Sequence, residues 1–216
     1  MPGPSRNYAK ELERLIQKLQ QEGKVPRLLL HACCAPCSSA VLEYLSQYFA
    51  ITLLYYNPNI APLEEYQKRE AELRRLVSQM KFTHSVALLP CQYDGQAFVQ
   101  AARGLEGEPE GGKRCEACFR LRLRYAAQEA ARLRFDYYTT TLSISPMKNA
   151  PLLNQLGEEI GREFGVAHLP SDFKKKDGYK RSVQLSKEYD LYRQDYCGCA
   201  FSKAQRQREK EEREEV

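Results

Sequence analysis

The stretch RLLLHACCAPCSS, residues 27–39, decides the fold. Its first part, residues 27–32, centres on three consecutive leucines, a pattern typical of a strand that is buried on both faces. Three cysteines follow, and Ser38 or Ser39 can cap a helix that we predict to continue to Tyr48. The stretch therefore predicts a strand, a cysteine-bearing loop and a helix in direct succession.

The same alternation continues along the chain. Further strands are predicted at residues 51–56, 84–89, 135–142 and 166–169, and helices at 8–19, 62–80, 94–102, 115–133, 151–164 and from 178 on. Strands that alternate with helices predict an α/β fold, with a mostly parallel sheet and helices on both faces. Such sheets place their sites at the carboxyl ends of the strands. We therefore expect the cysteine loop, the turn Asn57-Pro58-Asn59 and the segment Ser143–Lys148 to gather at one edge.

The composition is that of a globular protein. Of 216 residues, 43% are hydrophobic and 28% are charged, and the net charge is +5, which is compatible with a nucleic-acid partner. No run approaches the ~18 apolar residues of a membrane span, and residues 1–10 lack the apolar core of a signal peptide. We therefore expect a cytoplasmic protein without a membrane partner.

Three segments follow from these patterns. Residues 1–26 hold an amphipathic helix, and residues 27–202 form a single α/β catalytic domain. Residues 203–216 form a charged tail with five basic and five acidic residues. Such a balanced charge pattern is typical of a solvated helix or a frayed end.

Eight cysteines are present, and seven of them fall into three groups. A cysteine density of this kind in a cytosolic protein favours metal binding or redox chemistry over a disulfide scaffold. Cys91 stands alone, and we expect it to be a small buried apolar residue.

Cys115 and Cys118 have the spacing at which two thiolates meet one metal or one cluster, and which also suits a redox disulfide. Cys33 and Cys34 are adjacent, so both reach one site only if the strand has already ended. Pro36 supports a loop there, because it disfavours helix at the preceding residue.

Together these four thiolates suit either zinc or an iron–sulfur cluster. Cys37 is a fifth thiol nearby, for which a closed structural zinc site has no use. Cys197 and Cys199 flank a single glycine, and a disulfide between them would close a small, strained and easily reduced ring. We therefore interpret this pair as a reversible electron store.

Two basic segments are candidates for RNA binding. Residues 113–134 hold seven basic and two acidic residues, a pattern that a solvated helix face explains equally well. The segment 174–181 is the stronger candidate, and its basic residues are Lys174, Lys175, Lys176, Lys180 and Arg181. Aromatic candidates for stacking on a base are Tyr55, Tyr56, Phe173 and Tyr179.

Several motifs, in this order, resemble those of one family. They are HACCAPCS at 31–38, YNPNI at 56–60, RCEACF at 114–119, TTL at 140–142 with Ser145, Pro146 and Lys148, and LYRQ at 191–194 followed by YCGC at 196–199. Between about Arg27 and Cys199 the chain resembles the QueH-type epoxyqueuosine reductases. The resemblance implies reduction of the epoxide of epoxyqueuosine at the tRNA wobble position, which gives queuosine and water in the last step of queuosine synthesis.

The resemblance also implies cofactors and a fold. Cys33, Cys34, Cys115 and Cys118 would bind a [4Fe–4S] cluster, and Cys37 would be a ligand of a second, mononuclear ion of iron or zinc. The fold would be the HUP type that is shared with ATP pyrophosphatases. Those relatives carry a glycine-rich phosphate loop where this chain has cysteines and Pro36, so we do not predict ATP binding. The partners would be tRNA carrying epoxyqueuosine and an electron donor that the sequence does not identify.

Two other functions compete with this one. A zinc-stabilised RNA-binding module without catalysis leaves Cys37 and the pair Cys197 and Cys199 unexplained. Another tRNA-modifying enzyme of the same fold, dependent on ATP, needs a phosphate loop that the sequence lacks. For the reductase, candidate proton donors are Tyr56, Lys148, Tyr196 and the thiols.

Overall fold

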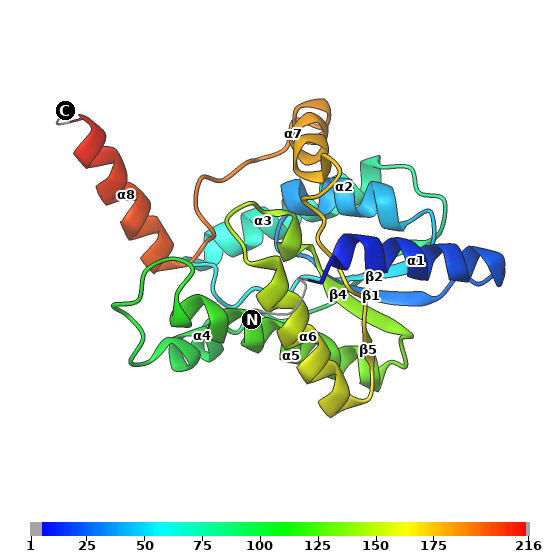
Figure 1. Ribbon diagram of the computed structural model, residues 1–216. Coiled ribbons are helices and arrows are strands. Elements are labelled where there is room, and N and C mark those ends of the chain that lie inside the picture. Colours follow the sequence, from blue (N-terminus) through cyan, green and yellow to red (C-terminus); the bar gives the residue numbers. More distant parts are fainter. Residues whose placement is uncertain (1–5, 215–216) are drawn as a thin grey trace.

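The computed structural model of the protein describes residues 6–214 (Figure 1). Its elements follow in the order α1 (Tyr8–Gln21), β1 (Arg27–His31), α2 (Ala35–Leu45), β2 (Ala50–Leu54), α3 (Leu63–Gln79), β3 (Val86–Leu89), α4 (Gly95–Ala102), α5 (Lys113–Arg132), β4 (Tyr137–Thr140), the 3-10 turn η1 (Thr141–Ile144), α6 (Ala150–Phe164), β5 (Ala167–His168), α7 (Gly178–Glu188) and α8 (Ala200–Glu214). Residues 1–5 of the predicted N-terminal segment and 215–216 of the predicted tail lie outside the described residues.

The five strands form one parallel sheet in the order β3-β2-β1-β4-β5. This confirms the predicted α/β fold with a parallel sheet. The chain builds outward from β1 through β2 to β3, and then resumes on the other side of β1 with β4 and β5. The order therefore reverses between β1 and β4, and sheets of this kind bind ligands in the crevice at that switch point.

Helices cover both faces of the sheet. Helices α1, α2, α3 and α7 lie on one side, and α4, α5 and α6 lie on the other (Figure 1). The buried strand β1 contributes side chains to the core on both faces of the sheet, because successive side chains point to opposite faces. Leu28 and Leu30 join the core cluster under α1 and α2, whereas Leu29 joins the cluster under α5 and α6.

The start of α2 corrects one prediction. The helix begins at Ala35 rather than near Ser38, and Cys34 is its extended N-cap residue. Pro36 occupies the first turn, where a helix tolerates proline because the N–H groups there have no intrahelical partner. The predicted loop across Ala35 and Pro36 is therefore wrong, and only Ala32, Cys33 and Cys34 lie between the strand and the helix.

Two other segments differ from their predicted form. The strand predicted at 135–142 ends at Thr140, whose hydroxyl accepts a hydrogen bond from the N–H of Leu142 and so starts the turn η1. The segment after Gly178 is predicted to be mostly helical, but α7 ends at Glu188 and an irregular stretch leads to α8. None of the helices in residues 6–214 is long and apolar enough to cross a bilayer.

Candidate functional site

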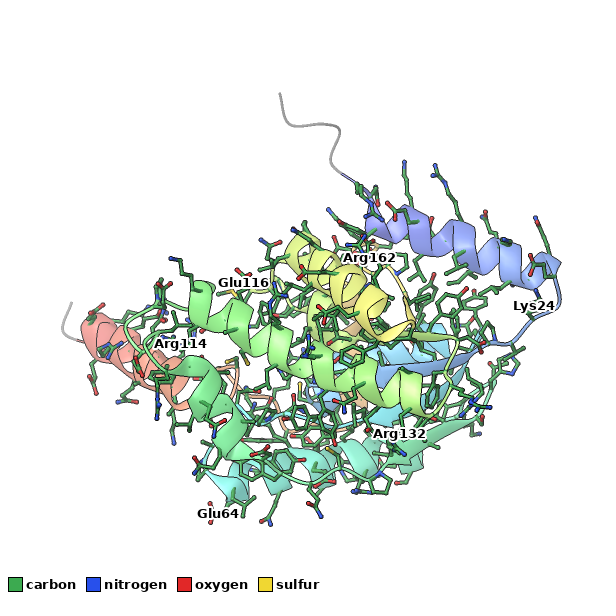
Figure 2. All side chains as sticks on the ribbon, turned by 90° about the horizontal axis from the view of Figure 1, so that it is seen from below. Lys24, Glu64, Arg114, Glu116, Arg132 and Arg162 are labelled. Carbon is green, nitrogen blue, oxygen red and sulfur yellow. The ribbon has the colours of Figure 1, made fainter. Side chains whose placement is uncertain are left out.

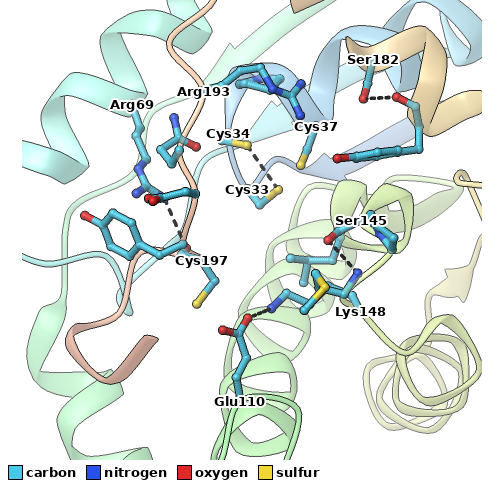
Figure 3. A pocket seen from close by; sticks show the side chains of 18 of the residues that line it. Cys33, Cys34, Cys37, Arg69, Glu110, Ser145, Lys148, Ser182, Arg193 and Cys197 are labelled. Carbon is cyan, nitrogen blue, oxygen red and sulfur yellow. Dashed lines mark hydrogen bonds and ion pairs between the residues drawn. The ribbon is translucent and has the colours of Figure 1, made fainter. Parts of the chain in front are cut away.

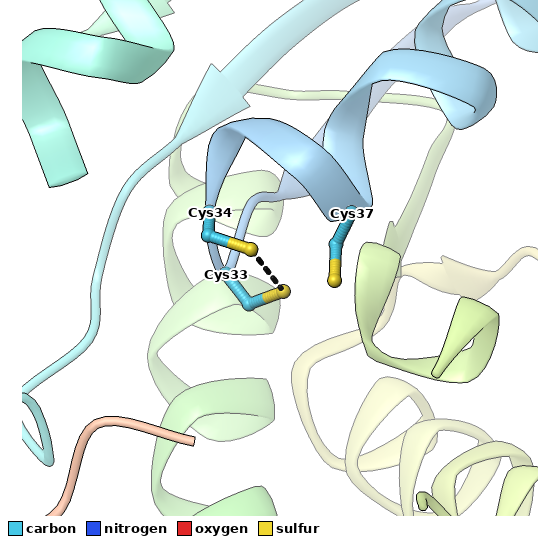
Figure 4. A group of neighbouring side chains, drawn as sticks. All are labelled: Cys33, Cys34 and Cys37. Atoms are coloured by element: carbon cyan, nitrogen blue, oxygen red, sulfur yellow. Dashed lines mark hydrogen bonds between the residues drawn. The ribbon is translucent and has the colours of Figure 1, made fainter. Parts of the chain in front are cut away.

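Three cysteine side chains meet directly after β1. Cys33 and Cys34 follow the strand, and Cys37 comes from the first turn of α2 (Figure 4). The Sγ atoms of Cys33 and Cys34 are 3.8 Å apart. All three Sγ atoms lie within 4.8 Å of one another. The adjacent thiols share one site because the strand has ended at His31, as the sequence predicts.

This cysteine trio sits at the switch point of the sheet. The hydroxyl of Thr141, which follows β4, accepts the N–H of Cys33 at 3.1 Å and donates to its Sγ at 3.3 Å. Hydrogen bonds from the thiols of Cys34 and Cys37 and from Thr141 hold the pKa of Cys33 well below its usual value. The pKa values of Cys34 and Cys37 are raised, chiefly by their hydrogen bonds to Cys33. The trio offers three sulfur ligands, and Cys33 is the one that most readily becomes a thiolate. Such ligands favour soft metal ions.

The trio lines a cavity of about 290 Å³ (Figure 3). Ser145 and Lys148 line it from the segment after β4. Asn57, after β2, donates from Nδ2 to the carbonyl oxygen of Ala32 at 2.9 Å. The expectation that these three segments gather at one sheet edge is confirmed.

Cations outnumber anions on the cavity wall. The basic residues are Arg69, Arg122, Lys148, Arg193 and Arg206, and the acidic ones are Glu110 and Asp195. A cavity with this balance suits an anionic ligand, such as the phosphate groups of a polynucleotide.

One thiol of the C-terminal pair, Cys197 and Cys199, also reaches this cavity. The Sγ atoms of Cys197 and Cys199 are 3.7 Å apart, and Cys197 lines the cavity wall. Cys199 directly precedes α8, and its Sγ accepts the N–H of Ser202 at 3.3 Å. The hydrogen bond with Cys199 and the nearby ammonium of Lys148 lower the pKa of Cys197 to about 5, whereas burial opposes this. The hydrogen bond to Cys197, together with burial, raises the pKa of Cys199.

A carboxylate that sequence reasoning missed organises this pair. Glu110 accepts from Nζ of Lys148 at 3.0 Å and from the hydroxyl of Ser202 at 2.9 Å. The same hydroxyl oxygen accepts the N–H of Cys197 at 3.2 Å. Burial acts to raise the pKa of Glu110, but Lys148 and Ser202 outweigh it and lower the value. No sequence signal marks Glu110, because it lies in a glycine-rich loop far along the chain from its partners.

Cys115 and Cys118 are buried in the first turns of α5. Cys115 belongs to the same packing cluster as Cys33, and its Sγ accepts the N–H of Gly111 at 3.2 Å. Cys118 packs in a small cluster with Cys199. Burial raises the pKa of Cys118 to about 11, against the lowering effect of Arg122.

The donor set has the chemistry that an iron–sulfur cluster requires. Ligands of a cubane stand at its four corners, further apart than the ligands of one ion. Cys115 packs in the same cluster as Cys33, Cys118 follows one turn later on α5, and all four cysteines are free thiols, as such a cluster requires. Cys37 completes the close trio with Cys33 and Cys34, which is compatible with a second ion beside them.

Cys91 stands apart from these groups. It is half-buried against the core cluster of α5 and α6, and its Sγ lies 3.9 Å from the hydroxyl of Tyr125. Burial raises its pKa. Cys91 thus packs against an apolar cluster, as expected, but it is only half-buried rather than buried.

His31 is fully buried at the end of β1. Its ring nitrogens lie 2.8 Å from the hydroxyl of Thr140 and 3.0 Å from the carbonyl oxygen of Tyr56. Burial lowers its pKa to about 4. Both nitrogens are occupied by hydrogen bonds, which leaves neither free to bind a metal.

The basic candidates for RNA binding differ in whether an acidic side chain already pairs with them. Lys174, Lys176 and Arg181 pair with Asp172, Glu13 and Glu43 respectively. Lys175 and Lys180 are exposed and form no ion pair within residues 6–214. Helices α5 and α6 lie side by side (Figure 2). Arg120 and Arg124 of α5 pair with Glu159 and Glu163 of α6, so charge along that exposed face is largely balanced.

The aromatic candidates for base stacking differ in their exposure. Tyr55, Tyr56 and Phe173 are buried, whereas Tyr179 is 40% exposed and lines the cavity. Met147 lines the same cavity and is 58% exposed, and sequence reasoning missed it. Two large apolar side chains at the opening are therefore available to contact a base.

Comparison with known proteins identifies the family. The family model described as epoxyqueuosine reductase QueH matches residues 28–205. The chain belongs to the QueH family. Curated QueH-family relatives named epoxyqueuosine reductase QueH include that of Streptococcus pyogenes, 42% identical over 203 residues, which are 93% of this chain and 80% of the relative. The one from Staphylococcus epidermidis is 42% identical over 200 residues, covering 91% and 84% of the two chains, and the one from Staphylococcus aureus is 40% identical over 203 residues, covering 92% and 85%. The chain is thus an oxidoreductase by family, as the resemblance predicts.

Proposed function

We propose that the protein reduces the epoxide of epoxyqueuosine at the tRNA wobble position to queuosine, the last step of queuosine synthesis. One observation carries the proposal. The trio of Cys33, Cys34 and Cys37 and the thiol of Cys197, whose Sγ lies 3.7 Å from that of Cys199, line a single cationic cavity at the switch point of a parallel sheet. The family assignment supplies the substrate class, because the matching relatives are named for this reaction.

The reaction needs two electrons and two protons. Both C–O bonds of the epoxide break, an alkene forms, and the oxygen leaves as water. Oxidation of the Cys197 thiolate and the Cys199 thiol to a disulfide releases two electrons and one proton, and a second proton from Lys148 or Tyr196, which line the cavity, closes the balance. An external reductant must then reopen the disulfide before the next turnover.

Four thiols are proposed as ligands of a [4Fe–4S] cluster: Cys33, Cys34, Cys115 and Cys118. When bound, the cluster would supply electrons one at a time, and a second ion of iron or zinc held by Cys37 would act as a Lewis acid. Side chains of the protein would donate the protons that the reaction needs. Lys148 and Tyr196 line the cavity, whereas Tyr56 is buried against Tyr125 and does not. Lys148 and Tyr196 are therefore the stronger candidate donors beside the thiols.

The chain's own surface would hold the tRNA. Tyr179 and Met147 would contact the displaced base at the cavity opening, and Lys175 and Lys180 would contact backbone phosphates. Residues 27–202 would form the catalytic domain between the N-terminal segment and the charged tail. A tRNA substrate and unpaired thiols both suit the reducing cytoplasm, and that location remains a prediction.

The test begins with protein purified without oxygen. Iron and sulfide analysis should give about four irons per chain with a broad visible absorption band, the stoichiometry of a [4Fe–4S] site. Turnover is then followed by mass spectrometry of nucleosides from tRNA that carries epoxyqueuosine. A colourless protein that holds only zinc after anaerobic reconstitution, and that leaves the tRNA unchanged, would instead support the zinc-stabilised RNA-binding module.

A further inference from the structure

Arg122 is a buried guanidinium on the wall of the cysteine cavity. It lies on α5 and is 4% exposed. Its Nε donates to the carbonyl oxygen of Cys118 and its Nη1 donates to Oδ1 of Asn57, both at 3.3 Å. Both hydrogen bonds are long, and both acceptors are neutral. An arginine stays charged in a protein, so this site buries a full positive charge.

The protein's other buried arginines have stronger partners. Arg69 pairs with the carboxylate of Glu65 at 2.7 Å. Arg114 donates to three carbonyl oxygens of the loop before α5. Arg122 has neither arrangement, and within residues 6–214 no carboxylate forms an ion pair with it, although Arg120 and Arg124 on the same helix are both paired. A buried cation left this way requires an anion from elsewhere.

Arg122 follows Cys118 by one turn of α5, and its positive charge acts to lower the pKa of the Cys118 thiol. Its Nε binds the backbone of Cys118, and the guanidinium lines the same cavity as Cys33 and Cys34. Through Asn57, which also binds the carbonyl oxygen of Ala32, it is linked to the segment that precedes Cys33. A cubane cluster on four thiolates carries net negative charge, and the charge grows by one when the cluster is reduced.

We propose that Arg122 is the charge-compensating residue of the thiolate site and that it raises the reduction potential of a cluster bound there. The inference rests on the proposed function, because it assumes that Cys33, Cys34, Cys115 and Cys118 hold a cluster. A fixed cation stabilises the more negative, reduced form more strongly than the oxidised form. Arg122 is therefore a tuning residue that acts on the cluster through its charge.

Three variants separate charge from structure. Arg122→Gln removes the charge but keeps an amide donor for Asn57 and Cys118, and Arg122→Lys keeps the charge. Arg124→Gln is the matched control, because it removes the same charge two residues away at a site that is exposed and paired with Glu163. Each protein is purified without oxygen, its iron content is measured, and the cluster is titrated with redox mediators while electron paramagnetic resonance follows the reduced form.

At the potential where half of the wild-type cluster is reduced, the ratio of oxidised to reduced cluster should rise about tenfold in Arg122→Gln, which is about 59 mV for one electron. Arg122→Lys and Arg124→Gln should stay near the wild-type ratio. Loss of the cluster in Arg122→Gln alone would also support compensation. Equal potentials in all four proteins, or loss of the cluster in both Arg122 variants, would overturn it. A wild-type protein that holds no cluster would instead overturn the proposed function.

Discussion

Cys197 and Cys199 differ in what each sulfur contacts. Cys197 lines the cavity, and the ammonium of Lys148 favours its thiolate. Cys199 is buried at the start of α8, and its hydrogen bond with Cys197 raises its pKa. A thiolate on the cavity wall next to a protonated partner is the arrangement of a dithiol that attacks through one sulfur and resolves through the other.

Cys197→Ser and Cys199→Ser should therefore each abolish most turnover on tRNA carrying epoxyqueuosine, because a single thiol cannot form the disulfide. Iron content and visible absorbance should remain at the wild-type level, since neither residue is among the four proposed cluster ligands. Cys91→Ser is the control, because Cys91 does not line the cavity. Normal turnover in both variants would sink the role of the pair as an electron store.

Glu110→Gln tests the carboxylate that joins Lys148 to Ser202. The lysine side chain is 10% exposed and the carboxylate 11% exposed, so the variant leaves a nearly buried ammonium without its anion. We expect a loss of about 1–3 kcal/mol in the free energy of unfolding, measured by urea titration. Asp195→Asn breaks the exposed pair with Lys210 and should cost less than about 1 kcal/mol. Equal losses in the two variants would contradict a structural role for Glu110.

Among the elements, the turn that carries the dithiol depends on Gly198. Its φ is +116°, and a Cβ there would lie 2.8 Å from Cγ1 of Ile60 and 2.9 Å from Nη1 of Arg69. Gly198 also accepts the N–H of Ala61 at 3.1 Å, and Arg69 binds the carbonyl oxygen of Cys197 at 3.3 Å. Because residue 198 has no side chain, the turn can pack closely against Ile60 and Arg69.

Gly198→Ala should destabilise this turn through both backbone strain and steric overlap. Gly104→Ala is a matched control, because Gly104 has a φ of +77° but nothing within 4 Å of a Cβ. We expect the control to cost about 1 kcal/mol in unfolding free energy and Gly198→Ala to cost about 2–4 kcal/mol. Limited proteolysis should also cut the Gly198→Ala protein first near residues 189–199. If both variants lose the same stability, close packing at Gly198 is not what the turn requires.

Local sequence predicts the elements better than it predicts their ends. The consecutive leucines within 27–32 and the apolar periods of the helices give the parallel sheet correctly, because burial dictates both patterns. The start of α2 is predicted too late. Pro36 disfavours a helical conformation at Ala35, but the first turn of a helix tolerates proline, and the second effect dominates here. Glu110 and Met147 escape sequence reasoning because their roles depend on loops that only the folded chain brings to the cavity.

At the scale of the whole molecule, the RNA-binding candidates are divided by their ion pairs. Lys176 and Arg181 already pair with Glu13 and Glu43, whereas Lys175 and Lys180 are exposed with no ion pair in the described part of the chain. The double variant Lys175→Gln/Lys180→Gln should weaken tRNA binding more than Lys176→Gln/Arg181→Gln. The slope of log affinity against log salt should fall by roughly 0.7–0.9 for each phosphate that no longer meets a cation. Equal affinities and slopes in the two double variants would place the RNA elsewhere.

The stability of the whole molecule should depend on pH through His168, which is remote from the cysteine cavity. Its ring packs against Gly157 and Tyr138, and neither ring nitrogen has a hydrogen-bond partner in residues 6–214. Burial lowers its pKa to about 3, whereas an unfolded chain binds the proton at about 6.5. The unfolded state therefore binds more protons between these values, and the stability that His168 contributes is complete above pH 6.5 and is lost as the pH falls toward 3.

His168→Phe keeps an aromatic ring against Tyr138 but removes the titrating group. Between pH 7 and pH 5 the wild-type protein should lose about 2 kcal/mol more unfolding free energy than this variant, measured by urea titration at each pH. Comparing the two proteins cancels the contributions of His31 and of the carboxylates, which both retain. An identical pH dependence would mean that the ring of His168 reaches water in the folded protein and binds its proton as freely as in the unfolded chain.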